Sequence, residues 1–231
     1  MDPAPEVDRR LTGQERWIFF AFLLGLVGLF TAEVVSNYEP RKLTALVFFM
    51  AWYPLIALHE AGHAITAHAL GWKVGQIVVG MGRRVATFRI GGAYVEMRAM
   101  PFSGSVSCVP GNLVRPRLKD ALIYAAGPGI ELILVLSIVF VVGPDVLLEA
   151  SENYGVILAQ GIAAAAATGA VTNLIPRLSL SSGRLVASDG LGILQSFGRP
   201  DAYYAELVGS TFNPDDNTWE AYEEADWWKR K

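Results

Sequence analysis

The sequence predicts a mainly α-helical membrane protein with about four transmembrane helices and a small membrane-associated β-meander between the second and the third. Hydrophobic residues make up 52% of the 231 residues and charged residues only 18%, whereas charged residues average about 25% in soluble domains. The apolar residues lie in runs long enough to cross a bilayer. Between two of these runs the pattern changes to an alternation of apolar and polar residues, which is typical of strands.

The four expected spans cover about residues 17–35, 43–70, 121–142 and 155–175. The first follows three arginines, but Asp2, Glu6 and Asp8 dilute this basic region, which favours an uncleaved signal anchor over a signal peptide. The last two carry small residues every four positions, namely Ala121, Ala125 and Gly129 in one and Gly161, Ala165 and Gly169 in the other. Small residues at this spacing let helix backbones approach closely in lipid, so we expect these faces to pack.

Basic residues predict how the chain lies in the membrane. The loop 71–119 contains eight Lys and Arg residues, whereas the loop 144–154 contains none. Because cytoplasmic loops are enriched in Lys and Arg, we expect a multi-pass protein of the cell membrane with both termini in the cytoplasm. Residues 1–16 would then form a cytoplasmic segment, 17–200 the membrane domain, and 201–231 an acidic cytoplasmic tail. The net charge of −3, without a long basic block, argues against a nucleic-acid partner.

A β-segment is expected at about residues 74–100. Val74–Val79 reads as a strand, Gly80-Met81-Gly82 interrupts the pattern, and the alternation resumes on both sides of Gly91-Gly92. Two glycines between alternating runs are a hairpin signal. We therefore expect this segment at the cytoplasmic surface of the membrane, just after the second span.

The second span ends in a group of residues typical of a zinc site, His59-Glu60-Ala61-Gly62-His63. Side chains four positions apart lie on one face of a helix, so both imidazoles can bind one Zn²⁺ while Glu60 serves as the general base. His68 lies nine residues after His59, on the opposite side of the helix, and is interpreted as structural or interfacial.

A catalytic zinc needs a third protein ligand. The single cysteine, Cys108, excludes a Cys₄ site and a disulfide within the chain, so a carboxylate is the natural choice. Asp189 is the best placed candidate, and Glu96 and Asp120 are less well placed. Glu131 lies inside the third span.

The chain resembles the site-2 protease family of intramembrane zinc metalloproteases over about residues 43–195. The resemblance rests on His59-Glu60-Ala61-Gly62-His63-Ala64, on Ala126-Gly127-Pro128, and on Asn173-Leu174-Ile175-Pro176 followed by Asp189-Gly190. It implies packed transmembrane helices around one Zn²⁺ near the cytoplasmic face, held by His59, His63 and Asp189. It also implies Glu60 as catalytic acid or base, and Asn173 as a residue that holds the substrate carbonyl.

Two features depart from the family pattern. Asp189 lies sixteen positions after Asn173, farther than in the compact family motif, and Glu131 stands where many members have Asn. Glu131 could be a proton carrier, a polar substrate contact or a structural acid, and the sequence slightly favours the last role.

The resemblance implies an endopeptidase that cuts in or near a transmembrane segment of another membrane protein, with the bilayer and that protein as partners. The alternative is a proteolytically inactive membrane scaffold or adaptor with the same fold. The oligomeric state is not predicted.

Overall fold

The computed structural model describes residues 38–181, 184–213 and 218–220, together with positions 24, 25, 27, 28, 31–33, 35 and 36. Its main helices are α2 (Leu43–Ala69), α3 (Pro116–Val142), α5 (Tyr154–Leu174) and α6 (Asp189–Gly198). The shorter elements are the 3₁₀ turn η1 (Pro40–Lys42), α4 (Pro144–Leu148) and α7 (Asp201–Leu207). The strands form three antiparallel pairs, β1 (Trp72–Ile90) with β2 (Ala93–Pro110), β3 (Leu178–Ser181) with β4 (Arg184–Ala187), and β5 (Thr211–Asn213) with β6 (Thr218–Glu220).

Within the described residues, α2, α3 and α5 are each long and apolar enough to cross a membrane. The expected first span, 17–35, lies mostly outside the described residues, so a fourth span stays a prediction, although the described positions between 24 and 36 are helical. The far half of α3 exposes large apolar side chains such as Phe140 and Val141, which are 91% and 80% exposed. An exposed apolar surface of this kind suits contact with lipid.

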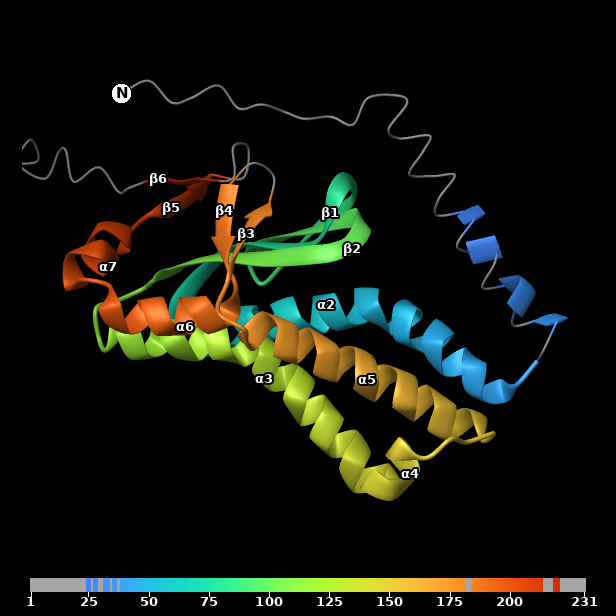
Figure 1. Cartoon of the computed structure of the whole chain (residues 1–231). Helices are drawn as coiled ribbons and strands as arrows, with labels where there is room; N and C mark the ends of the chain where they lie inside the picture. The colour runs from blue at the N-terminus through green and yellow to red at the C-terminus, as the bar shows by residue number, and fades with distance from the viewer. Residues whose placement is uncertain are drawn as a thin grey trace, which may run out of the picture.

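The three helices pack through small residues, as the sequence predicted for α5. A Cβ at Gly161 would lie 2.5 Å from the Val47 side chain of α2, and Ala165 is buried against Leu55. The expectation is wrong for Gly129 of α3, where a Cβ would meet no described atom within 4 Å. Figure 1 shows that α3 bends part-way along its length, and Pro128 lies inside this helix. A proline removes a backbone hydrogen bond and commonly kinks a helix.

The β-segment is longer than the expected residues 74–100 and is a doubled-back hairpin rather than a simple meander. Residues 76–79 of β1 pair both with 94–97 and with 104–107 of β2, so they lie in the middle of the small sheet. The strand pattern continues after Met100, because Phe102, Val106 and Cys108 alternate with Ser103, Ser105 and Ser107. The predicted Gly91-Gly92 turn is present, with φ values of 56° and 93°, as two-residue hairpin turns require.

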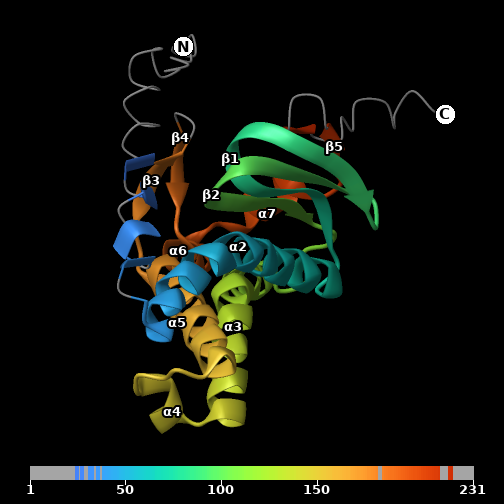
Figure 2. The ribbon, with the colours of Figure 1, turned by 90° about the vertical axis from the view of Figure 1, so that its right-hand side faces the viewer.

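This hairpin arches over α2 on one side of the helices (Figures 1 and 2). The hydroxyl of Tyr53, near the middle of α2, donates a hydrogen bond to the carbonyl of Arg98 at 2.9 Å. A Cβ at Gly104 of β2 would lie 2.3 Å from Oε1 of Glu60. The glycine therefore allows β2 to lie directly against the second half of α2, where the candidate ligands are found.

Residues after 188 fold back onto the first half of α3. Asp120 of α3 is buried and accepts hydrogen bonds from Ser196 (3.0 Å), Arg199 (2.5 Å) and Tyr204 (2.8 Å). Phe212 and Trp219 of the β5–β6 pair lie against Gly75 of β1. The described part of the expected acidic tail is thus packed on the membrane domain, whereas 221–231 lie outside the described residues.

Candidate metal centre

The helical spacing of the His-Glu-x-x-His sequence places two imidazoles side by side in the second half of α2. His59 and His63 are both buried, and their Nε2 atoms are 3.1 Å apart. They lie ten and six residues before the end of α2 at Ala69, which corresponds to depths of about 15 Å and 9 Å along the helix. The pair therefore lies inside a membrane-crossing helix, nearer to the end that carries the β1–β2 hairpin.

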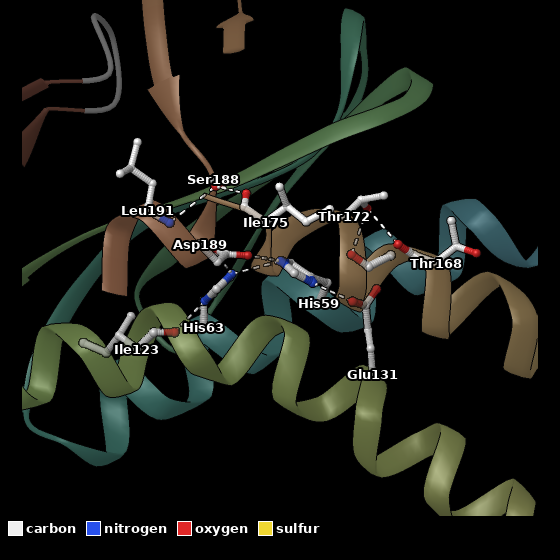
Figure 3. Close-up of polar contacts among 11 residues, drawn as sticks. His59, His63, Ile123, Glu131, Thr168, Thr172, Ile175, Ser188, Asp189 and Leu191 are labelled. Atoms are coloured by element: carbon white, nitrogen blue, oxygen red, sulfur yellow. Dashed lines mark hydrogen bonds and ion pairs between the residues drawn. The ribbon is translucent and has the colours of Figure 1, made fainter. Parts of the chain in front are cut away.

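Asp189, the first residue of α6, completes the cluster. Its Oδ2 atom lies 3.0 Å from Nε2 of His59, and its Oδ1 atom lies 3.3 Å from Nε2 of His63. Figure 3 shows the three side chains pointing toward one another from α2 and α6.

The sixteen-residue separation of Asn173 and Asp189 does not separate them in space, because the additional residues form the β3–β4 hairpin. Ser188 closes the base of this hairpin. Its N–H donates to the carbonyl of Arg177 at 3.0 Å, and its hydroxyl donates to the carbonyl of Ile175 at 2.8 Å. The same hydroxyl accepts the N–H of Leu191 and caps α6. Asp189 is thereby held beside the end of α5.

Two glycines allow this close packing. A Cβ at Gly190 would lie 1.9 Å from the carbonyl oxygen of Leu174, so α6 can begin here only with glycine. A Cβ at Gly127 of α3 would lie 2.3 Å from Nε2 of His63 and 2.6 Å from Nε2 of His59. Gly127 belongs to the Ala-Gly-Pro sequence, and its part in the site is to leave room for the imidazole pair.

The donor set fits a zinc ion. Ligand atoms about 2.0–2.1 Å from a tetrahedral zinc lie roughly 3.3 Å apart. Here the two Nε2 atoms are 3.1 Å apart, and they lie 3.0 Å and 3.3 Å from the Oδ2 and Oδ1 atoms of Asp189. Nδ1 of His63 lies 2.6 Å from the carbonyl oxygen of Ile123. A carbonyl only accepts, so this nitrogen carries the proton and Nε2 presents a lone pair to the cluster. Lone pairs and a carboxylate that face one another in a buried site need a cation between them.

The cluster opens into a cavity of about 240 Å³. Glu60 lines this cavity and is only 5% exposed, and Asn173, at the end of α5, lines it as well. Phe102, Ser103 and Gly104 of β2 form part of another wall. Four of the five residues expected from the sequence, His59, Glu60, Asn173 and Asp189, therefore line one cavity, and His63 lies behind it in contact with His59 and Asp189.

The other ligand candidates lie elsewhere. Glu96 bonds with Gln76 and Arg98 in the β1–β2 sheet, and Asp120 bonds with Arg199. His68 is exposed and is outside the cluster. The sequence did not reveal that Glu131 contacts His59, with Oε2 at 3.1 Å from Nδ1. The sequence also could not reveal that the Ile123 carbonyl contacts His63, since every residue type has a backbone carbonyl.

Comparison with protein families agrees with this geometry. The model of peptidase family M50 matches residues 47–180, which is more than half of the chain. The chain belongs to peptidase family M50. This family is the site-2 protease family, and its members are zinc-dependent. The match contains His59, Glu60, His63 and Asn173 but ends before Asp189, so the third ligand rests on the structure. No curated protein matches the chain.

Membership of family M50, together with three apolar helices of membrane-crossing length, indicates a multi-pass membrane protein. The family also implies a metalloprotease.

Proposed function

We propose that this M50 protein is an intramembrane zinc endopeptidase that hydrolyses a peptide bond in or near a transmembrane segment of another membrane protein. The observation that carries the proposal is the cluster of His59, His63 and Asp189, which opens through His59 and Asp189 into a cavity that Glu60 also lines. Both histidines and Glu60 lie on α2, a helix that can cross a membrane. Three protein ligands and a nearby carboxylate are what a catalytic zinc site requires.

His59, His63 and Asp189 would hold one Zn²⁺ per chain. Bound zinc lowers the pKa of water towards about 7 and polarises a carbonyl. The two histidines are fixed through their Nδ1 atoms by acceptors on α3, the carbonyl of Ile123 and the carboxylate of Glu131. Both rings therefore present Nε2 to the same point.

Glu60 is the proposed general base and acid. It follows His59 directly on α2 and lines the cavity beside the ligands. Its carboxylate would take a proton from the attacking water and deliver it to the nitrogen of the leaving amine. The Glu60 side chain is buried against Gly104 of β2, and this burial shields the proton transfer from bulk water.

Asn173 is the proposed carbonyl-holding residue. It lines the same cavity from the end of α5, so its side-chain amide can donate a hydrogen bond to the oxygen of the bound peptide group. Such a donor stabilises the charge that develops on that oxygen during attack.

The substrate would bind as an extended segment beside β2. A helical segment hides its peptide bonds and must unwind before attack, and an extended segment can add to a sheet edge through main-chain hydrogen bonds. Residues 104–107 of β2 pair with 76–79 on one side, and Phe102, Ser103 and Gly104 line the cavity. An added strand on the other side would pass the metal ligands.

The proposed orientation puts the centre near the cytoplasmic face, with both termini in the cytoplasm. The ligands lie at the same end of the helices as the β1–β2 hairpin, which contains Lys73, Arg83, Arg84, Arg89 and Arg98. The opposite end carries α4 and η1, with the two basic residues Arg41 and Lys42. An excess of Lys and Arg, here at the hairpin end, marks the cytoplasmic side of membrane proteins.

The test compares cells that express the wild-type chain with cells that express Glu60→Gln. New protein N-termini are mapped by mass spectrometry in membrane fractions. We expect cleavage sites inside or beside transmembrane segments that appear with the wild type and are absent with Glu60→Gln, because the variant keeps the metal ligands but lacks the base. Equal sets of cleavage sites, in strains with equal expression and zinc content, would contradict the proposal and favour the inactive scaffold.

A further inference from the structure

Glu131 is a buried acid inside a membrane-crossing helix, and the proposed reaction does not require it. It is 3% exposed and lies in the middle of α3. An ionisable side chain at this depth is costly and is retained where it has a specific partner. Its partner is His59, since Oε2 of Glu131 lies 3.1 Å from Nδ1 of His59 (Figure 3).

The contact is on the side of the imidazole away from the cluster. Nδ1 of His59 faces Glu131, and Nε2 faces Asp189 and His63. Glu131 therefore reaches the opposite face of the ring and is not a fourth ligand to the same ion. A metal at the cluster takes the lone pair of Nε2, which leaves the ring proton on Nδ1, so the Glu131 oxygen is the acceptor of this contact.

The surroundings of Glu131 make room for this contact. A Cβ at Gly169 of α5 would lie 2.6 Å from Oε1 of Glu131, so a larger residue there would displace the carboxylate. The arrangement matches that of His63, whose Nδ1 is held by the Ile123 carbonyl of the same helix. Both imidazoles are thus oriented from α3, His63 by the backbone carbonyl of Ile123 and His59 by the carboxyl group of Glu131.

We propose that Glu131 is a positioning residue of the metal centre, which accepts a hydrogen bond from His59 Nδ1–H and so presents His59 Nε2 to the zinc ion. This inference rests on the proposed zinc site. In this role Glu131 contributes to metal affinity. Proton transport and substrate contact, the two other roles considered for this residue, would leave zinc binding unchanged, so a measurement of zinc affinity separates them.

The test measures zinc affinity in the purified full-length chain in mild detergent, by competition with a chromophoric chelator. Removal of such an outer partner costs about 10–100-fold in metal affinity. We expect a loss in this range for Glu131→Leu, and a smaller loss for Glu131→Gln, which keeps an acceptor of the same length. The control is Glu96→Gln, which removes a buried acid remote from the histidines and should bind zinc as the wild type does.

A second readout separates positioning from general destabilisation. The chain is loaded with Co²⁺, and the visible absorption bands of the metal report the geometry of its ligands. We expect the bands of Glu131→Gln to shift while its helix content and thermal stability match those of Glu96→Gln.

The outcomes are distinguishable. A wild-type chain that binds no zinc would contradict the proposed function itself. A wild-type chain that binds zinc, together with Glu131 variants of equal affinity and unchanged Co²⁺ spectra, would contradict only the role of Glu131. Loss of cleavage without loss of zinc in Glu131→Gln would likewise overturn it and assign Glu131 to the substrate or to proton transfer.

Discussion

Gly127 and Gly129 of α3 lie two residues apart and have opposite surroundings. A Cβ at 127 would collide with Nε2 of both histidines, whereas a Cβ at 129 would meet no described atom within 4 Å. We expect Gly127→Ala to weaken zinc binding at least about tenfold, the lower end of what disturbed ligand orientation costs, and Gly129→Ala to leave it unchanged. Zinc titration of the two purified variants checks this, and equal affinities would contradict the packing of Gly127 against the ligands.

Cys108 provides a pH-dependent test on β2, outside the membrane-crossing helices. Burial, together with the nearby negative charge of Asp120, raises the pKa of the Cys108 thiol to about 12. Because the thiolate is the reactive form, alkylation by iodoacetamide should remain slow at pH 8 and still increase above pH 10. In the denatured chain the same rate should level off above about pH 9, near the ordinary pKa. Equal pH profiles for the folded and denatured chains would show that the thiol is not shielded.

At the scale of single residues, the sequence was informative where chemistry depends on residue type. His59, Glu60 and His63 could be found because their spacing matches one helical face, and Asp189 because it lies just past the last span in the pair Asp189-Gly190. Ile123 could not be found, since it acts through its backbone carbonyl. Glu131 could be noticed but not assigned, because its distance from His59 depends on how α3 packs against α2.

At the scale of elements, α6 is held on α3 by the hydrogen bonds of Asp120. Replacement of Asp120 by Asn would leave Arg199 without its counter-ion, and loss of one partner of a buried pair costs about 3–5 kcal/mol. We expect a value at the lower end of this range, since the Arg199 side chain is 21% exposed. Tyr204→Phe removes one hydrogen bond and should cost about 1 kcal/mol.

Thermal unfolding in detergent, followed by circular dichroism, ranks these two variants. Asp120→Asn should also weaken zinc binding, because α6 begins with the ligand Asp189. If Asp120→Asn were no less stable than Tyr204→Phe, the ion pair would not hold α6 in place.

The β3–β4 hairpin is predicted to be dispensable for metal binding. Its base is closed by the hydrogen bond from Ser188 N–H to the Arg177 carbonyl. If only two residues connected Arg177 to Ser188, the same hydrogen bond would close a four-residue β-turn. Replacement of residues 178–187 by Asn-Gly should therefore keep one zinc per chain. Ser179, Val186 and Ala187 line the cavity, so we expect the set of cleavage sites to change. Loss of zinc from a folded deletion variant would show that the hairpin itself positions Asp189.

Element boundaries show what local patterns can predict. Helices α2 and α5 lie within one residue of the expected 43–70 and 155–175 at each end, because long and mostly apolar segments define them. α3 begins five residues earlier than expected, at Pro116, since its first turn is polar and packs on α6 rather than in lipid. The doubled-back path of β1 and β2 was not predictable, because pairing between distant residues leaves no local pattern.

At the scale of the whole molecule, three apolar helices and a basic hairpin enclose one polar cavity. The helices α2 and α5 contribute His59, Glu60 and Asn173 to its lining, the strand β2 contributes a wall, and α6 contributes Asp189, while His63 contacts His59 and Asp189 from behind. The sequence predicted the fold class and the family, and the family is confirmed. The enclosure of the cavity arises from packing and could only be seen in three dimensions.

The central claim is that His59, His63 and Asp189 hold a zinc ion. The most direct measurement is the zinc content of the full-length chain, purified in mild detergent and analysed by mass spectrometry, for the wild type and Asp189→Ala. We expect about one zinc per wild-type chain and a sharp reduction in the variant, since two imidazoles alone do not complete a catalytic site. A wild-type chain without zinc after loading, or an undiminished zinc content in Asp189→Ala, would contradict it.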